Sequence, residues 1–174
     1  MPRIPNRFGG GARTNEHGLQ FEQGTNLNEA LEDAGFTIRG HEVYFRGNFM
    51  GLSVNKAKFA TVFLRSHNIN DREINSKRWE PDEAFVNECN KTVYIIEKKF
   101  QEQAGSVDEK LATFPFKIKE YQRLLANTDY DLKYIYLLSS EWFNKPKYQD
   151  YYYYMDELNC PYYFDTLPLS AIGL

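Results

Sequence analysis

Hydrophobic residues along this chain follow two spacings, one typical of helices and one typical of strands. Apolar side chains three and four positions apart predict helices, which cover residues 14–34, 56–67, 106–126 and 147–158. Thr14 or Asn15 would cap the first helix, and Gly35 stands where a C-cap belongs. A proline at position 115 predicts a break within the third helix.

Shorter apolar runs predict strands, which cover residues 42–49 (a strand or hairpin), 84–86, 92–100, 132–139 and a last one that begins at 162. Residues 92–100 give the strongest pattern because β-branched and aromatic residues dominate them. Residues 87–91 are typical of a turn that joins this strand to the preceding one. The order of elements predicts an α/β (α+β) domain in which helices flank a central mixed sheet.

Length and composition narrow the class of protein. The 174 residues suit a single domain that folds without a disulfide or metal. With 42% hydrophobic and 16% aromatic residues, the chain is not a disordered one. No apolar run approaches the roughly 18 residues of a membrane helix, so no membrane partner is expected. The N-terminal residues lack the apolar stretch of a secretory signal, so the expected location is cytoplasmic.

The first 13 residues differ from the rest because they hold Arg3, Arg7 and Arg13, three consecutive glycines and no acid. This composition predicts a flexible basic arm over 1–13, followed by one domain over 14–174; a frayed terminus is the alternative. The net charge of −3 weighs against a generally basic nucleic-acid coat. It is compatible with a locally basic cleft.

Charged residues that could take part in catalysis gather around the predicted hairpin. Side chains alternate along a strand, so Glu97 and Lys99 share one face and Lys98 lies on the other. If the hairpin folds back through residues 87–91, Asp82 reaches the same end of the strand. Two carboxylates and an ammonium would then converge at the polar end of an apolar strand.

Such a convergence suits a metal site. Neighbouring carboxylates repel one another unless a cation lies between them. Hard oxygen ligands without cysteine or histidine favour Mg²⁺, which acidifies a bound water and neutralises charge on phosphorus. A lysine beside the ion can orient the attacking water or stabilise the phosphorane. These groups are the ones that metal-assisted phosphodiester hydrolysis requires.

Each motif also has a structural interpretation. Glu97-Lys98-Lys99 could form a solvated strand end that protects an edge, and Pro81-Asp82 could form an ordinary turn. Glu22 by itself is typical of an exposed helix glutamate. The apolar run before Glu97 favours a central strand instead, where charge costs energy unless it has a partner or a purpose.

The spacing resembles a known signature: Pro81-Asp82, then fourteen residues, then Glu97-Lys98-Lys99 is similar to the motif of the PD-(D/E)xK nuclease superfamily. Residues 15–22 (NEHGLQFE) resemble the first helix of small type II restriction endonucleases, and residues 92–111 resemble their segment from the catalytic strand into the next helix. The resemblance extends from about Gly11 to the C-terminus. It implies a restriction-endonuclease-like core.

Roles follow from the resemblance residue by residue. Asp82 and Glu97 would bind Mg²⁺ together with the main-chain carbonyl of Lys98, and Lys99 would be the catalytic lysine. Glu22 would be an accessory catalytic carboxylate. Because arginine pairs with guanine and asparagine or glutamine with adenine, the expected base contacts are Arg13 and Asn15 near the first helix and Lys77 and Arg78 just before the motif. Gln101 continues the strand face of Glu97 and Lys99 and would contact the DNA strand being cleaved.

The predicted function is that of a Mg²⁺-dependent type II restriction endonuclease. It would cleave double-stranded DNA at a specific short sequence and leave 5′-phosphate and 3′-hydroxyl ends. A homodimer is expected because its two-fold symmetry matches palindromic DNA. The resemblance also implies a cognate DNA methyltransferase and a prokaryotic or phage-encoded source. The alternatives are a repair or junction-resolving nuclease of the same superfamily, and a non-catalytic DNA-binding module on a degenerate nuclease fold.

Overall fold

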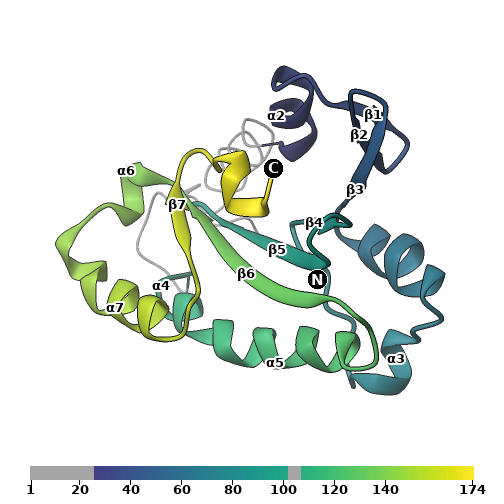
Figure 1. The fold of residues 1–174 in the computed structure, drawn as a ribbon. Helices are drawn as coiled ribbons and strands as arrows, with labels where there is room; N and C mark the ends of the chain where they lie inside the picture. The colour runs from purple at the N-terminus through teal and green to yellow at the C-terminus, as the bar shows by residue number, and fades with distance from the viewer. Residues whose placement is uncertain (1–25, 102–106) are drawn as a thin grey trace, which may run out of the picture.

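A mixed sheet forms the centre of the computed structural model, which describes residues 26–101 and 107–174 (Figure 1). In these residues it has seven strands, adjacent in chain order: β1 (Thr37–Arg39), β2 (Glu42–Phe45), β3 (Asn48–Val54), β4 (Glu83–Asn87), β5 (Thr92–Lys99), β6 (Asp131–Leu138) and β7 (Tyr162–Phe164). Strands β1 to β5 are antiparallel to their neighbours, whereas β5, β6 and β7 are parallel. The sheet and its flanking helices confirm the predicted fold class.

Helical elements lie before β1, after β7 and in the three longer connections, β3–β4, β5–β6 and β6–β7, whereas short turns join the other strands. The α-helices are α2 (Leu27–Asp33), α3 (Asp71–Ile74), α4 (Val107–Lys110), α5 (Phe114–Leu125), α6 (Ser140–Phe143) and α7 (Gln149–Glu157). Elements of other helical types are η1 (Phe59–Leu64), η2 (Leu111–Thr113), η3 (Pro146–Tyr148) and η4 (Leu169–Ile172). Because β6 and β7 are parallel to β5, their connections must cross over, and α5 and α7 lie in those crossovers.

The hairpin of β4 and β5 forms where the sequence predicts it. Its register pairs Asn87 with Thr92 at the turn and Glu83 with Ile96 at the far end. The Asn87 side chain organises the turn, since its Oδ1 accepts hydrogen bonds from the N–H groups of Cys89 and Asn90 at 2.9 and 3.2 Å. The hairpin therefore has one defined register.

Each face of the sheet carries its own apolar core. Helix α5 lies along one face and α2 along the other, with η4 near α2 (Figure 1). The core on the α5 face includes Val93, Ile95, Leu124, Tyr134 and Tyr136. The core on the α2 face includes Leu31, Phe85, Tyr94, Ile96 and Ile172. Strand β5 contributes alternate residues to both cores, which makes it the buried centre of the domain.

Three of the predicted helical regions lie wholly or partly in the described residues and differ in their details. The break predicted near Pro115 is confirmed, because α4 and η2 end at Thr113 and α5 begins at Phe114, with this proline in its first turn, where its missing N–H costs no helical hydrogen bond. The helix predicted over 56–67 is a π-helix, η1, over part of that range. Of the helix predicted over 14–34, only residues 26–34 lie in the described part, and they contain α2. The basic arm predicted over 1–13 lies outside the described residues.

No helix within 26–101 and 107–174 has both the length and the apolar character needed to span a membrane.

Candidate active site

The β4–β5 hairpin places Asp82 beside the end of β5. The last residue pair of the hairpin is Glu83 with Ile96, so Asp82 lies one step further, level with Glu97. The N–H of Lys98 donates a hydrogen bond of 2.8 Å to Asp82 Oδ2. The antiparallel register thus brings the aspartate of the Pro-Asp pair to the backbone of the Glu-Lys-Lys segment.

Glu97 is the centre of an ion cluster on the α5 face. Its Oε1 accepts hydrogen bonds from Lys99 Nζ at 2.7 Å and from Lys117 Nζ at 2.6 Å. Burial alone would raise the pKa of the Glu97 carboxyl, but the two ammonium groups outweigh it and hold that pKa below its usual range. Glu97 is therefore ionised at neutral pH, although only 7% of the residue is exposed.

Lys99 has a second partner at the same point. Its ammonium also donates to the main-chain carbonyl of Lys98 at 3.1 Å. One cation thus contacts the Glu97 carboxylate and the Lys98 carbonyl together. These are two of the three oxygen groups that the sequence predicts as metal ligands.

Buried tyrosines form the apolar wall of this cluster. Lys99 Nζ lies 5.9 Å from the centre of the Tyr136 ring. Burial raises the pKa of the Tyr121 hydroxyl, and the negative charges of Glu97 and Asp82 raise it further. Both carboxylates therefore act on one buried ring, which places them in the same electrostatic neighbourhood.

A different ion pair lies behind Glu97, on the α2 face. Lys98 Nζ is 3.2 Å from Glu83 Oε1, and the lysine side chain is only 3% exposed. The Leu27 N–H at the start of α2 also donates to the Glu83 carboxylate, at 3.1 and 3.2 Å to its two oxygens. Burial raises the pKa of Glu83 even though Lys98 opposes that effect. Glu83 thus joins β5 to the start of α2.

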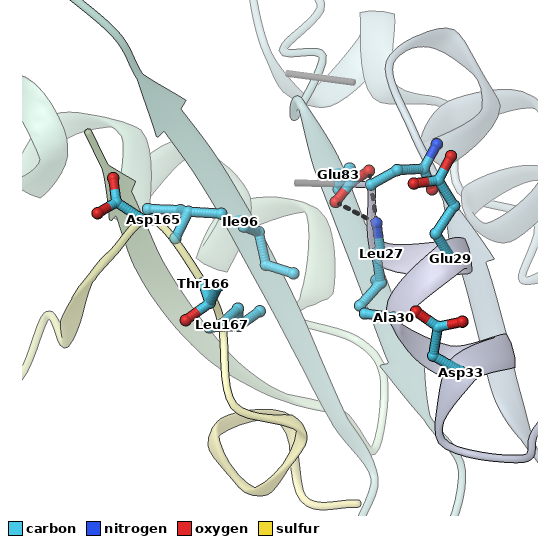
Figure 2. Close-up of a pocket in the computed structure, with 11 residues that line it drawn as sticks. Leu27, Glu29, Ala30, Asp33, Glu83, Ile96, Asp165, Thr166 and Leu167 are labelled. Carbon is cyan, nitrogen blue, oxygen red and sulfur yellow. Dashed lines mark hydrogen bonds between the residues drawn. The ribbon is translucent and has the colours of Figure 1, made fainter. Parts of the chain in front are cut away.

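Glu83 also borders a cavity of about 160 Å³ between α2 and the segment after β7. Figure 2 shows Glu83 next to Leu27, with Glu29 and Asp33 on the helix and Asp165 and Thr166 across the cavity. The side chains around this cavity include three further acids besides apolar groups. Glu83 faces this cavity, whereas Glu97 and Lys99 lie on the other side of the sheet.

The residues predicted to contact DNA have varied surroundings. Arg78 forms two hydrogen bonds with Asp71, Nε to Oδ2 at 2.7 Å and Nη2 to Oδ1 at 3.0 Å. The ammonium of Lys77 lies 4.7 Å from the centre of the Trp79 ring, and Gln101 is buried at 5% exposure. Their roles in DNA binding stay predictions. Arg13, Asn15 and Glu22 lie outside the described residues.

Two members of these clusters were absent from the sequence prediction. Lys117 belongs to α5, and no local pattern links it to Glu97 because the contact depends on how α5 packs on the sheet. Glu83 is different, since strand alternation and the hairpin register already place it on the same face as Lys98. That signal was available in the sequence.

The donor groups suit a hard divalent cation. Asp82, Glu97 and the Lys98 carbonyl offer only oxygen, and the ammonium of Lys99 already contacts two of these groups. Among the described residues, no group of three or more histidine, cysteine, aspartate or glutamate side chains could hold a metal. A metal here would therefore need main-chain oxygen or solvent beside the two carboxylates.

The mixed sheet and the hairpin that brings Asp82 to the backbone of the Glu97-Lys98-Lys99 segment are the features that a comparison with known families can test. Residues 13–143 match the model of the PD-(D/E)XK nuclease superfamily domain, which covers most of the chain. The chain therefore belongs to the PD-(D/E)XK nuclease superfamily. No match was found among curated proteins or among solved structures.

Proposed function

We propose that this protein is a Mg²⁺-dependent type II restriction endonuclease that cleaves double-stranded DNA at a specific short sequence. The observation that carries the proposal is the single ammonium of Lys99 in contact with both the Glu97 carboxylate and the Lys98 carbonyl. Charged groups at the end of a buried central strand are costly without partners or a function. A nuclease superfamily domain supplies that function.

In this proposal Asp82, Glu97 and the Lys98 carbonyl hold Mg²⁺. When bound, the ion supplies positive charge at the scissile phosphate and makes a water molecule more acidic. Lys99 orients the attacking water and stabilises the negative charge that develops on phosphorus. The backbone N–H of Lys98 keeps the Asp82 carboxylate in place. The products are a 5′-phosphate and a 3′-hydroxyl.

The remaining features of the proposal concern assembly and partners. One chain provides one site, so cleavage of both strands at a symmetric sequence is simplest for a homodimer. A cognate DNA methyltransferase would protect the host sequence. Glu22 would act as an accessory carboxylate, and contacts with DNA would come from Arg13, Asn15, Lys77, Arg78 and Gln101.

The test is incubation of unmethylated phage DNA with the purified protein in Mg²⁺ or in EDTA, followed by gel electrophoresis. Discrete bands in Mg²⁺ alone are the expected result, and mapping their ends gives the sequence and the end type. A Mg²⁺-dependent smear, or cutting of branched DNA alone, would replace restriction by a repair or junction-resolving activity. Intact DNA from several sources, linear and branched, would favour a non-catalytic DNA-binding module.

A further inference from the structure

Lys117 stands out among the residues without an assigned role. It lies near the start of α5, and its ammonium approaches Glu97 Oε1 to 2.6 Å. Lys99 contacts the same oxygen atom at 2.7 Å. Two positive charges thus meet on one carboxylate oxygen, although one charge is sufficient to neutralise it.

The two lysines differ in their other contacts. Lys99 also donates to the Lys98 carbonyl. Each ammonium also lies 5.9 Å from the centre of an aromatic ring, Lys99 from Tyr136 and Lys117 from Trp79. Among the described contacts, the hydrogen bond to the Lys98 carbonyl is therefore what separates the two lysines. Lys117 is therefore the ammonium that can leave Glu97 with less loss.

Trp79 is itself held firmly. Its indole N–H donates to Glu120 Oε2 at 3.2 Å, and its ring contacts the Phe116 ring edge-on at 5.9 Å between centres. Glu120 and Phe116 both belong to α5, the helix that carries Lys117. The tryptophan thus packs on the helix that carries Lys117 and lies beside its ammonium.

We propose that Lys117 is a second active-site lysine that binds a phosphate oxygen of the DNA strand being cleaved. Without substrate it pairs with Glu97, and it exchanges that carboxylate for the phosphodiester when Glu97 takes another cation. The ligand class is a nucleic-acid phosphodiester. This inference rests on the proposed nuclease function and extends it to a residue outside the Asp, Glu and Lys of the motif.

The first test measures binding in the inactive Glu97→Gln background, with a dye-labelled DNA duplex followed by fluorescence anisotropy in EDTA at several salt concentrations. Adding Lys117→Gln should reduce the slope of log affinity against log salt by about 0.9, the value for one lost phosphate contact. Adding Lys119→Gln is the matched control, because Lys119 is an exposed lysine two residues along the same helix. The variant that adds Lys119→Gln should keep the salt slope of the Glu97→Gln background.

The second test measures single-turnover cleavage at saturating Mg²⁺. Lys117→Gln should lower the rate about 100-fold, in the range for a lost group that stabilises transition-state charge. Lys117→Arg should retain most of the activity, and Lys119→Gln all of it. A merely structural lysine would alter the unfolding transition instead and leave the salt slope unchanged.

A wild-type salt slope and a wild-type rate for Lys117→Gln would overturn the inference and make Lys117 only a counter-ion of Glu97. The two proposals fail separately. If the wild-type protein cleaves no DNA, the proposed nuclease function falls, whereas the salt slope still decides whether Lys117 contacts a phosphate.

Discussion

Strand β5 ends in two ion clusters, one on each face of the sheet. The cluster on the α5 face joins Glu97 to Lys99 and Lys117, and the cluster on the α2 face joins Glu83 to Lys98 and to the start of α2. The side chains of both clusters are at most 20% exposed. The two clusters are therefore buried to a similar extent but contain different numbers of lysines.

The two clusters differ in how many ammonium groups contact the carboxylate. Among the described contacts, Glu83 has one ammonium and one backbone N–H as donors, an arrangement complete in itself. Glu97 carries two ammonium groups on a single oxygen, which leaves positive charge for another anion. The pKa of Glu83 is raised by burial, whereas that of Glu97 is lowered by its lysines. We therefore expect the cluster around Glu83 to be structural and the cluster around Glu97 to act in the proposed binding and catalysis.

The largest expected effect is on catalysis. Lys99→Met removes the ammonium that contacts both Glu97 and the Lys98 carbonyl, so cleavage should slow by about a thousandfold. Lys117 still pairs with Glu97, so the unfolding free energy should change little. Single-turnover rates and urea unfolding measure the two quantities. A stable variant that cleaves at the wild-type rate would contradict the assigned role.

The opposite pattern is expected for the neighbouring lysine. Lys98→Met leaves the buried Glu83 carboxylate without its ammonium, which should cost at least about 3 kcal/mol of unfolding free energy. The double variant Glu83→Gln with Lys98→Met removes both charges and should recover most of that loss. Urea unfolding at neutral pH provides the measurement. If the double variant were less stable than Lys98→Met alone, the ion pair would not explain the loss.

The ion pair of Asp71 with Arg78 lies away from β5 and gives a reference for how much a pair outside the two clusters stabilises the fold. Arg78 holds the pKa of the Asp71 carboxyl below its usual range. The contribution of this ion pair to the free energy of unfolding is therefore present above the ordinary aspartate pKa of about 4. It is lost as the pH falls through the lower pKa of the folded state. Arg78→Met should cost about 1 kcal/mol at pH 6.

The pH dependence of the stability lost in Arg78→Met tests whether the ion pair causes that loss. The difference in unfolding free energy between wild type and Arg78→Met should be constant above about pH 5 and should shrink toward pH 2. Thermal or urea unfolding across that range measures it. A difference that grows with acidity would show that the pair does not act as described.

The smallest expected effect concerns Lys77, which contacts the Trp79 ring on the side of the sheet that carries Lys117. If DNA covers this face, Lys77→Gln should reduce the salt slope of DNA binding by about 0.9 and weaken binding only a few-fold. The unfolding free energy should stay the same. An unchanged slope would place the DNA elsewhere and remove Lys77 from the predicted contacts.

Local patterns were enough to predict the β4–β5 hairpin. The alternation in residues 92–99 and the turn at 87–91 depend on neighbours in sequence, so the strand, its partner and the faces of Glu97 and Lys98 followed from them. The break near Pro115 followed from the same local reasoning, because a proline is tolerated in the first turn of a helix but not in its interior, and α5 begins one residue before it.

The contact of Lys117 with Glu97 could not be predicted in the same way. It joins residues on different elements, and its existence depends on the position of α5 over the sheet rather than on any spacing in the sequence. The short helix α3 was also missed, since its four residues offer too little periodicity to recognise. The pairing of Glu83 with Lys98 lies between these cases, because the hairpin register implies it.

The most direct test of the account is the rate of Mg²⁺-dependent DNA cleavage by Glu97→Gln, compared with wild type under identical conditions. The amide has nearly the same shape as the carboxylate but removes the charge that Lys99 and Lys117 share. We expect a folded protein, verified by near-ultraviolet circular dichroism, whose cleavage falls by at least about a thousandfold. A folded Glu97→Gln that cleaves within tenfold of wild type would contradict the claim that this cluster performs the chemistry.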